Sequence, residues 1–270
     1  NWRHKRLEIQ DKIILRKLNL RSENNINKIL RENKFNEVYN LAGQSVVNGS
    51  IKDTLNSCEN TALGVVRLLE GLRKYNFNAR FYQASSAEMF GNSDKKYQNE
   101  NTAFNPRNPY AISKLFGHHI CKYYREHHKL YAVSGILYNH ESPLRSEEFV
   151  TRKIIKNLVR ISKGEKIKLQ LGNIYTKRDW GYAEEYVEAM WKMLQLKNPQ
   201  DFVIASGKEN SVKKFIDIAI KILNIDAKWI GKGTKEKLIF RSTDKILIEI
   251  NSKLIRKREN NLLIGDTSKA

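Results

Sequence analysis

The sequence predicts an α/β fold built on a parallel β-sheet, and three observations carry that prediction. Short apolar runs of strand length alternate with longer segments whose apolar residues recur every three or four positions. Hydrophobic residues make up 40% and charged residues 29% of a 270-residue chain, which is typical of a globular protein with a sizeable core. Polar side chains follow the apolar runs, as they do at the carboxyl edge of a parallel sheet.

The first half of the chain supplies most of the candidate strands. Strands are expected at 12–20, 36–43, 79–86 and 130–139. The segments between them have helical periodicity, with helices expected at 23–33 (capped by Ser22), 53–74 and 110–128. Strands that alternate with helices imply right-handed crossovers, and therefore parallel pairing.

The second half has a different pattern. A basic helix is expected at 149–163, a short strand at 166–172, a buried strand at 201–206 and a helix from 212 that Ser211 caps. A further helix at 183–194 is expected to turn one apolar stripe to the core, comprising Ala183, Tyr186, Val187, Met190, Trp191 and Leu194.

Composition excludes several classes of protein. The formal net charge is +20, but the basic residues are scattered, and no zinc-finger or aromatic-rich nucleic-acid motif is present, so a nucleic-acid partner is not expected. The sequence contains no run of 18 apolar residues, so no membrane-spanning helix is expected. Cys58 and Cys121 have no ligand-spaced neighbours, which indicates reduced thiols of a cytoplasmic protein and no metal site.

The stretch NPYAISKLF at 108–116 places Tyr110 and Lys114 four residues apart, hence on one face of a helix. With 12 tyrosines in a lysine-rich chain, such a spacing also arises by chance. An ammonium beside a phenol favours the phenolate, so we expect the Tyr110 pKa to fall below its usual value and make it a general base. Ser86, at a neighbouring strand end, adds a hydroxyl to the pair.

This Ser/Tyr/Lys combination is the core of the short-chain dehydrogenase/reductase superfamily, and further stretches narrow the resemblance. They are VYNLAGQS, RFYQASSAEMFG, NPRNPYAISK, GILYNHESP, FVTRKI, KRDWGYAEEYVEAMWKML, DFVIASG and LLIGDTSKA. In this order, over residues 12–270, the sequence resembles the GDP-mannose 4,6-dehydratase family. Ala87 stands where the related dTDP-glucose dehydratases have an aspartate, which favours the GDP-mannose branch.

The resemblance implies a Rossmann-like fold and an enzyme that converts GDP-mannose to GDP-4-keto-6-deoxymannose on bound NADP. Tyr110 would be the base that takes the hexose O4 proton, and Lys114 would support Tyr110. Ser86 would share the O4 proton, and Glu88 would remove the C5 proton and assist loss of the C6 hydroxyl. Residues 1–142 and 173–205 would form the NADP-binding domain, and 143–172 and 206–270 a smaller substrate domain. A homo-oligomer, either dimer or tetramer, is also implied.

The same resemblance assigns binding residues. The expected cofactor contacts are Asn19, Leu20, Leu41, Ala42, Gln44, Ser45, Tyr110, Lys114, His140 and Arg145. The expected substrate contacts are Glu88, Asn139, Val150, Lys153, Arg178 and Arg256. Arginine suits the diphosphate because its planar fork binds two oxygens at once.

The chain departs from the family at its start, where no glycine-rich turn of the G-x-x-G-x-x-G kind is found, and at its end, which stops before the family's closing helix. We therefore expect a fragment or a degenerate copy that lacks the first strands of the cofactor domain. Two other functions stay open: a non-catalytic remnant that acts as an oligomer partner or scaffold, and a nucleotide-sugar reductase or epimerase of the same fold.

Overall fold

The computed structural model describes residues 2–43, 47–255 and 263–270. Its α-helices are α1 (Trp2–Arg6), α2 (Glu23–Glu32), α3 (Val47–Lys52), α4 (Thr54–Cys58), α5 (Gly64–Tyr75), α6 (Pro109–His128), α7 (Val150–Ser162), α8 (Ala183–Gln195) and α9 (Val212–Ile222). A π-helical turn at Glu59–Leu63 joins α4 to α5, and the single turns η1, η3, η4 and η5 are 3-10 helices (Gln10–Lys12, Ala87–Phe90, Gly233–Lys235 and Ser252–Leu254).

The strands form three sheets. They are β1 (Glu37–Asn40), β2 (Arg80–Ser86), β3 (Ala132–Leu137), β4 (Asn139–Glu141), β5 (Leu169–Leu171), β6 (Lys177–Tyr182), β7 (Phe202–Ile204), β8 (Glu209–Ser211), β9 (Ala227–Ile230), β10 (Lys237–Phe240) and β11 (Ile246–Ile250). The first sheet has the order β1-β2-β3-β7, the second β5-β11-β10-β9 and the third β4-β6-β8.

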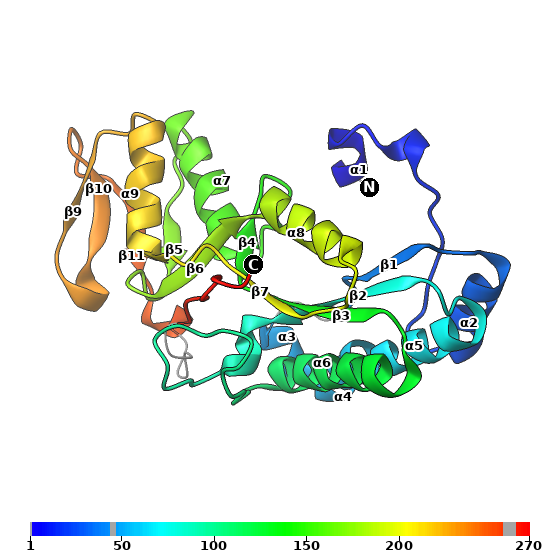
Figure 1. Ribbon diagram of the computed structural model, residues 1–270. Helices are drawn as coiled ribbons and strands as arrows, with labels where there is room; N and C mark the ends of the chain where they lie inside the picture. The colour runs from blue at the N-terminus through cyan, green and yellow to red at the C-terminus, as the bar shows by residue number, and fades with distance from the viewer. Residues whose placement is uncertain (1, 44–46, 256–262) are drawn as a thin grey trace.

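The first sheet is entirely parallel, which confirms the predicted fold class. Its two central strands, β2 and β3, are almost fully buried, as expected for a sheet covered on both faces. Helices α3 to α6 lie on one face and α8 on the other (Figure 1). All four carboxyl ends point to one edge, so β2 delivers Ser86 beside the end of β3.

Buried apolar residues form several cores, and two of these cores are the largest. Leu69, Phe81 and Cys121 belong to the core between the first sheet and α2, α5 and α6. A distinct core lies between α7, α9 and the second sheet, around Leu158, Ile216 and Leu247. Figure 1 shows these last elements together at the opposite end of the molecule from α2.

The predicted strand at 12–20 is wrong. Residues 13–19 have extended or irregular backbone without strand pairing, and Ile14 is 82% exposed. Apolar composition alone cannot make a strand, because the backbone also needs a hydrogen-bonded neighbour. Within the described ranges β1 pairs only with β2, so it is the edge of its sheet.

The stripe predicted on α8 is only partly correct. Tyr186, Met190 and Leu194 are buried against the first sheet, together with Met193. Val187 and Trp191 are instead exposed, although their spacing fits the same helical period. The face that α8 buries is therefore rotated toward Met193.

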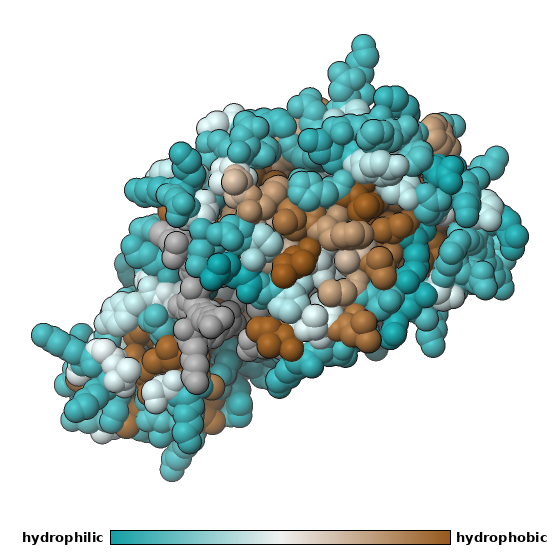
Figure 2. All heavy atoms as spheres, turned by 90° about the horizontal axis from the view of Figure 1, so that it is seen from below, coloured by the Kyte–Doolittle hydropathy of each residue, from teal (hydrophilic) through white to brown (hydrophobic). Residues whose placement is uncertain are grey.

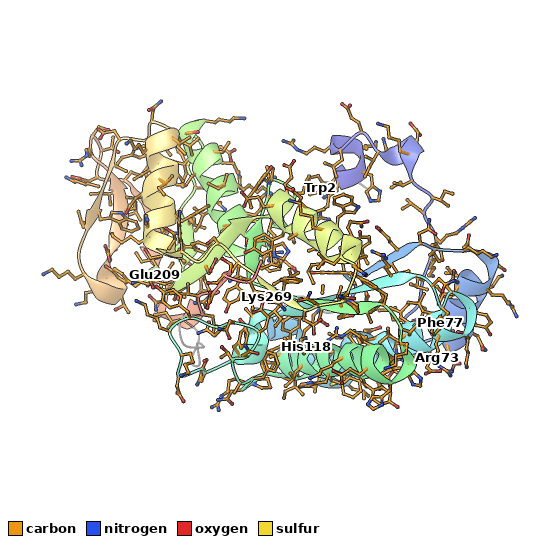
Figure 3. The ribbon with its side chains drawn as sticks, in the orientation of Figure 1. Trp2, Arg73, Phe77, His118, Glu209 and Lys269 are labelled. Carbon is orange, nitrogen blue, oxygen red and sulfur yellow. The ribbon has the colours of Figure 1, made fainter. Side chains whose placement is uncertain are left out.

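His118 on α6 gives the fold a pH dependence. Its side chain is 7% exposed, and burial lowers its pKa to about 4, with Asp201 opposing that shift and His119, Arg125 and Lys122 adding to it. Figure 3 shows its position below the first sheet. The unfolded chain takes up this proton below about pH 6.5, whereas the folded state resists it until about pH 4. Folding stability is therefore lost as the pH falls through this window.

We expect His118→Gln to reduce, by about 2 kcal/mol, the drop in unfolding free energy between pH 7 and pH 4.5. Urea unfolding at both pH values measures it. His119→Gln is the matched control, because His119 is the exposed neighbour on the same helix. Equal pH slopes for His118→Gln and the parent would show that His118 is not the titrating group.

Candidate active site

The site begins where β2 ends. Ser86 is the last residue of that strand, and its Oγ accepts a hydrogen bond from the backbone N of Glu88 at 3.2 Å. This bond caps the single 3-10 turn η3, which carries Glu88 out of the sheet. Gly91 ends the turn with φ 54°, where an added Cβ would lie 1.8 Å from the Asn105 carbonyl oxygen.

Helix α6 supplies the other two predicted catalytic residues. Asn108 caps it, since its Oδ1 accepts from the backbone N of Ala111 at 2.9 Å, and Pro109 occupies the first helical position. The Nζ of Lys114 lies 5.8 Å from the centroid of the Tyr110 ring. It also donates to the Ala84 carbonyl oxygen at 2.8 Å, so helix and strand are tied together directly below Ser86.

The expected fall in the Tyr110 pKa is wrong for this structure. Burial has the largest effect and raises the pKa of the phenol, and the negative charge of Glu88 raises it further. A hydrogen bond with the Ser86 side chain and the positive charge of Arg145 act in the opposite direction and lower the pKa. Lys114 is directed to the Ala84 carbonyl instead. The groups that favour the phenolate are therefore Ser86 and Arg145.

Lys114 is itself buried, and that burial lowers its pKa to about 8. A pKa in this range leaves most of the ammonium protonated at pH 7. The carbonyl oxygen of Ala84 can only accept a hydrogen bond, so it is a suitable partner for the protonated amine of Lys114.

His140 and Arg145 line a second part of the site. They border a hollow of about 300 Å³ together with Ser142, Phe149 and Ala183. His140 Nδ1 lies 2.8 Å from the Tyr138 carbonyl, and because a carbonyl only accepts, Nδ1 carries the proton. Burial lowers the His140 pKa, so this ring is neutral near pH 7.

Arg145 is held from two sides. Its guanidinium lies 3.5 Å from the Phe149 ring centroid, and its Nε is 3.3 Å from Glu141 Oε2. Thr151 donates to the same Glu141 oxygen at 2.7 Å. These contacts fix Arg145 beside Tyr110 and join β4 to the start of α7.

A carboxylate beside a Ser/Tyr/Lys group can do more than move one proton. The serine and tyrosine suit removal of a proton from a hydroxyl that is being oxidised. Glu88 adds a carboxyl group at the same strand end, and an elimination needs one further group that can exchange a proton. Residues 1–270 match the family described as GDP-mannose 4,6 dehydratase.

The chain belongs to the GDP-mannose 4,6-dehydratase family. It is 44% identical to the GDP-mannose 4,6 dehydratase of Drosophila melanogaster over 90% of this chain and 62% of that protein. Identity is 41% with the Sinorhizobium fredii relative, over 91% and 71% of the two chains. With the Dictyostelium discoideum relative it is 40%, over 98% and 75%. The chain thus spans between 62% and 75% of the length of these relatives.

Solved structures agree on the fold. RMD from Pseudomonas aeruginosa, complexed with NADPH, has a TM-score of 0.80 at 20% identity, covering 95% of this chain and 80% of that one. The UDP-glucose 4-epimerase of Thermotoga maritima has a TM-score of 0.81 at 18% identity, covering 96% and 77%. Such similarities show a Rossmann-like architecture shared by enzymes of different activity.

The remaining residues expected from the dehydratase resemblance are more widely spread. Asn139 is exposed on β4, and Val150 opens α7. Lys153 Nζ donates to the Gln170 carbonyl at 3.1 Å, and an Arg178 guanidinium nitrogen donates to the Lys177 carbonyl at 2.7 Å.

The remaining expected cofactor contacts come from the first 45 residues. Asn19 is exposed, while Leu20 is buried in the core beside α2 and α5. Leu41 and Ala42 are exposed immediately after β1. Gln44, Ser45 and Arg256 lie outside the described residues.

Sequence reasoning overlooked two residues of the site, Asn108 and Glu141. Asn108 Nδ2 donates to Glu88 Oε2 at 3.3 Å, and Glu141 holds Arg145. An asparagine just before Pro-Tyr signals a helix cap, but nothing local signals its contact with residue 88. A larger hollow of about 360 Å³ lies elsewhere, beside His118 and Lys269, and contains none of the predicted catalytic residues.

The described residues contain no group of three or more His, Cys, Asp or Glu side chains arranged to hold a metal ion. No helix among them combines the length and apolar character that crossing a membrane requires.

Proposed function

We propose that this protein is an NADP-dependent GDP-mannose 4,6-dehydratase that forms GDP-4-keto-6-deoxymannose. The observation that carries the proposal is the position of Glu88 beside Ser86 and Tyr110. An oxidation alone needs the hydroxyl and the phenol, whereas loss of water also needs a group that removes a carbon-bound proton.

The nicotinamide end of a dinucleotide fits the residues present. Lys114 and Tyr110 would hold the ribose hydroxyls, while His140 and Arg145 line the adjoining hollow. Asn19, Leu20, Leu41 and Ala42 are the candidates for the adenosine half. When bound, NADP accepts a hydride from C4 of the hexose and later returns it to C6. The NADPH and NAD named for the structural neighbours support a nicotinamide cofactor.

The side chains then divide the proton transfers. Tyr110, hydrogen bonded to Ser86, takes the O4 proton as C4 is oxidised. The C4 ketone acidifies the C5 proton, which Glu88 removes. Glu88 passes this proton to the C6 hydroxyl, which leaves as water. As C6 gains the hydride, C5 takes up a proton in place of the one that Tyr110 removed from O4, so the product carries a C4 ketone and a C6 methyl group. Asn139, Val150, Lys153 and Arg178 face the GDP part of the substrate in this proposal.

The two largest cores suggest that cofactor binding and substrate binding belong to different parts of the chain. We propose that residues 1–142 and 173–205 serve the cofactor, and that 143–172 and 206–270 serve the nucleotide sugar. Leu263 nevertheless belongs to a smaller buried cluster with Phe90 of η3 and Val203 of β7, so the last residues connect both parts. We also propose a cytoplasmic enzyme, in keeping with the free thiols of Cys58 and Cys121.

The activity is tested with the full-length gene product, NADP and GDP-mannose deuterated at C4. The expected product is a 4-keto-6-deoxy sugar that carries the label at C6, with no net accumulation of NADPH. If the C6 hydroxyl is retained, the protein is a reductase or an epimerase. If no turnover of any kind occurs in a protein that binds both ligands, the non-catalytic alternative gains support.

We also propose that the protein assembles as a homo-oligomer. Exposed apolar side chains project from neighbouring helices, including Ile51 (α3), Leu55 (α4), and Ile112 and Phe116 (α6). Figure 2 shows apolar residues gathered on the side of the molecule where Figure 1 places these helices. A second copy is the proposed occupant, because two such faces bury each other by symmetry.

We expect Leu55→Lys to shift the protein toward the monomer in sedimentation velocity, because a charge at the centre of an apolar interface is costly to bury. Ile222→Lys is a closely matched control: Ile222 and Leu55 are both 74% exposed, but Ile222 lies on α9. An unchanged sedimentation profile for Leu55→Lys would argue against this face.

A further inference from the structure

Asn108 makes two contacts that lead in opposite directions. Its Oδ1 accepts from the Ala111 backbone N at 2.9 Å and so caps α6. Its Nδ2 donates to Glu88 Oε2 at 3.3 Å. One planar amide thus connects the helix that carries Tyr110 to the carboxylate that lies 20 residues earlier in the sequence.

The geometry restricts where the Glu88 carboxylate can point. The backbone of Glu88 is held by Ser86 Oγ, and its carboxylate is held by Asn108. Because the Asn108 oxygen is committed to the helix cap, the direction of its amide nitrogen is fixed as well. Asn108 is also only two residues from Tyr110, so this side chain fixes the position of the Glu88 carboxylate relative to the Tyr110 phenol.

We propose that Asn108 is a positioning residue that aims the Glu88 carboxylate at the C5 proton and C6 hydroxyl of the bound hexose. This inference rests on the proposed dehydratase function. It assigns Asn108 to the elimination and not to the first hydride transfer, which uses Ser86, Tyr110 and the cofactor. A helix cap alone would not make that distinction.

The two roles of Asn108 are separable by substitution. Serine and aspartate both keep an oxygen that can cap α6. Neither provides the amide N–H that reaches Glu88, and aspartate adds a like charge that repels the carboxylate. Both variants should therefore fold like the parent. Asn108→Ser should lose only the contact to Glu88, and Asn108→Asp should also repel the Glu88 carboxylate.

The experiment follows both stages in the full-length gene product loaded with NADP. Single-turnover absorbance reports reduction of the cofactor by GDP-mannose, and exchange of the C5 proton with deuterated solvent reports the action of Glu88. For Asn108→Ser we expect the first rate within about twofold of the parent. For both variants we expect C5 exchange slower by about tenfold to a hundredfold, as a small misplacement of a reacting group costs.

Asn251→Ser is the matched control. The Oδ1 of Asn251 also caps a turn, because it accepts from the Lys253 backbone N, and its Nδ2 donates to Gln170 Oε1 at 2.9 Å. However, Asn251 follows β11 of the second sheet and not a strand of the first. It should change neither rate. The inference is overturned if Asn108→Ser exchanges the C5 proton at the parent rate, or if both stages slow by the same factor. A parent that forms no 4-keto-6-deoxy product overturns the proposed function, and the inference with it.

Discussion

Tyr110→Phe should abolish turnover while binding of GDP-mannose persists. The variant keeps the ring beside Lys114 and removes only the hydroxyl that is hydrogen bonded to Ser86. Loss of a general base typically costs about a hundredfold to ten-thousandfold in rate. Because the O4 proton is removed in the first stage, single-turnover reduction of NADP should fall by the same factor as product formation.

Tyr123→Phe provides the control on the same helix. Tyr123 is exposed on α6, more than three turns away from Tyr110, and its hydroxyl should not affect the rate. Calorimetric titration with GDP-mannose separates binding from chemistry. Near-parental turnover by Tyr110→Phe would remove Tyr110 from the mechanism.

The raised pKa of Tyr110 makes this test more informative. A phenol that stays protonated needs its neighbours to release the proton, and Ser86 and Arg145 are the groups that favour release. We therefore see Tyr110 as one member of a hydrogen-bonded group rather than as an isolated pair with Lys114. Spacing in the sequence placed Tyr110 and Lys114 on one face of α6, but it could not show that Lys114 is directed to the Ala84 carbonyl.

Local signals explain which parts of the fold were predictable. Asn108 and Pro109 define the start of α6, and Ser211 caps α9, so these helices could be read from a few adjacent residues. The apolar runs of β2 and β3 are long enough to mark buried strands. In each case the deciding interactions lie within one turn or one strand.

Longer-range interactions explain the errors. Residues 12–20 have the composition of a strand, but strand pairing depends on a neighbour that composition does not contain. On α8, Val187 and Trp191 fit the apolar period, yet the position of the sheet decides which side of the helix is buried. The bond from Asn108 to Glu88 likewise depends on how η3 meets α6.

Glu88→Gln should stop the reaction after the first hydride transfer. Glutamine keeps the size of the side chain and an oxygen that can accept from Asn108, so the site should stay packed. It cannot take up the C5 proton. With GDP-mannose in a single turnover, the variant should therefore reduce bound NADP close to the parent rate and then stall as the 4-keto sugar.

This stall separates a dehydratase from every other enzyme on the same fold. Glu88 is the only carboxylate in the segment from Gln83 to Gly91, and it shares one strand end with Ser86. We expect exchange of the C5 proton with deuterated solvent to slow by about a hundredfold or more, and little 4-keto-6-deoxy product to be released. Glu126→Gln, an exposed change on α6, should leave both stages intact. Product formation by Glu88→Gln at the parent rate would make Glu88 a bystander, because a group that removes the C5 proton cannot be replaced by an amide without loss.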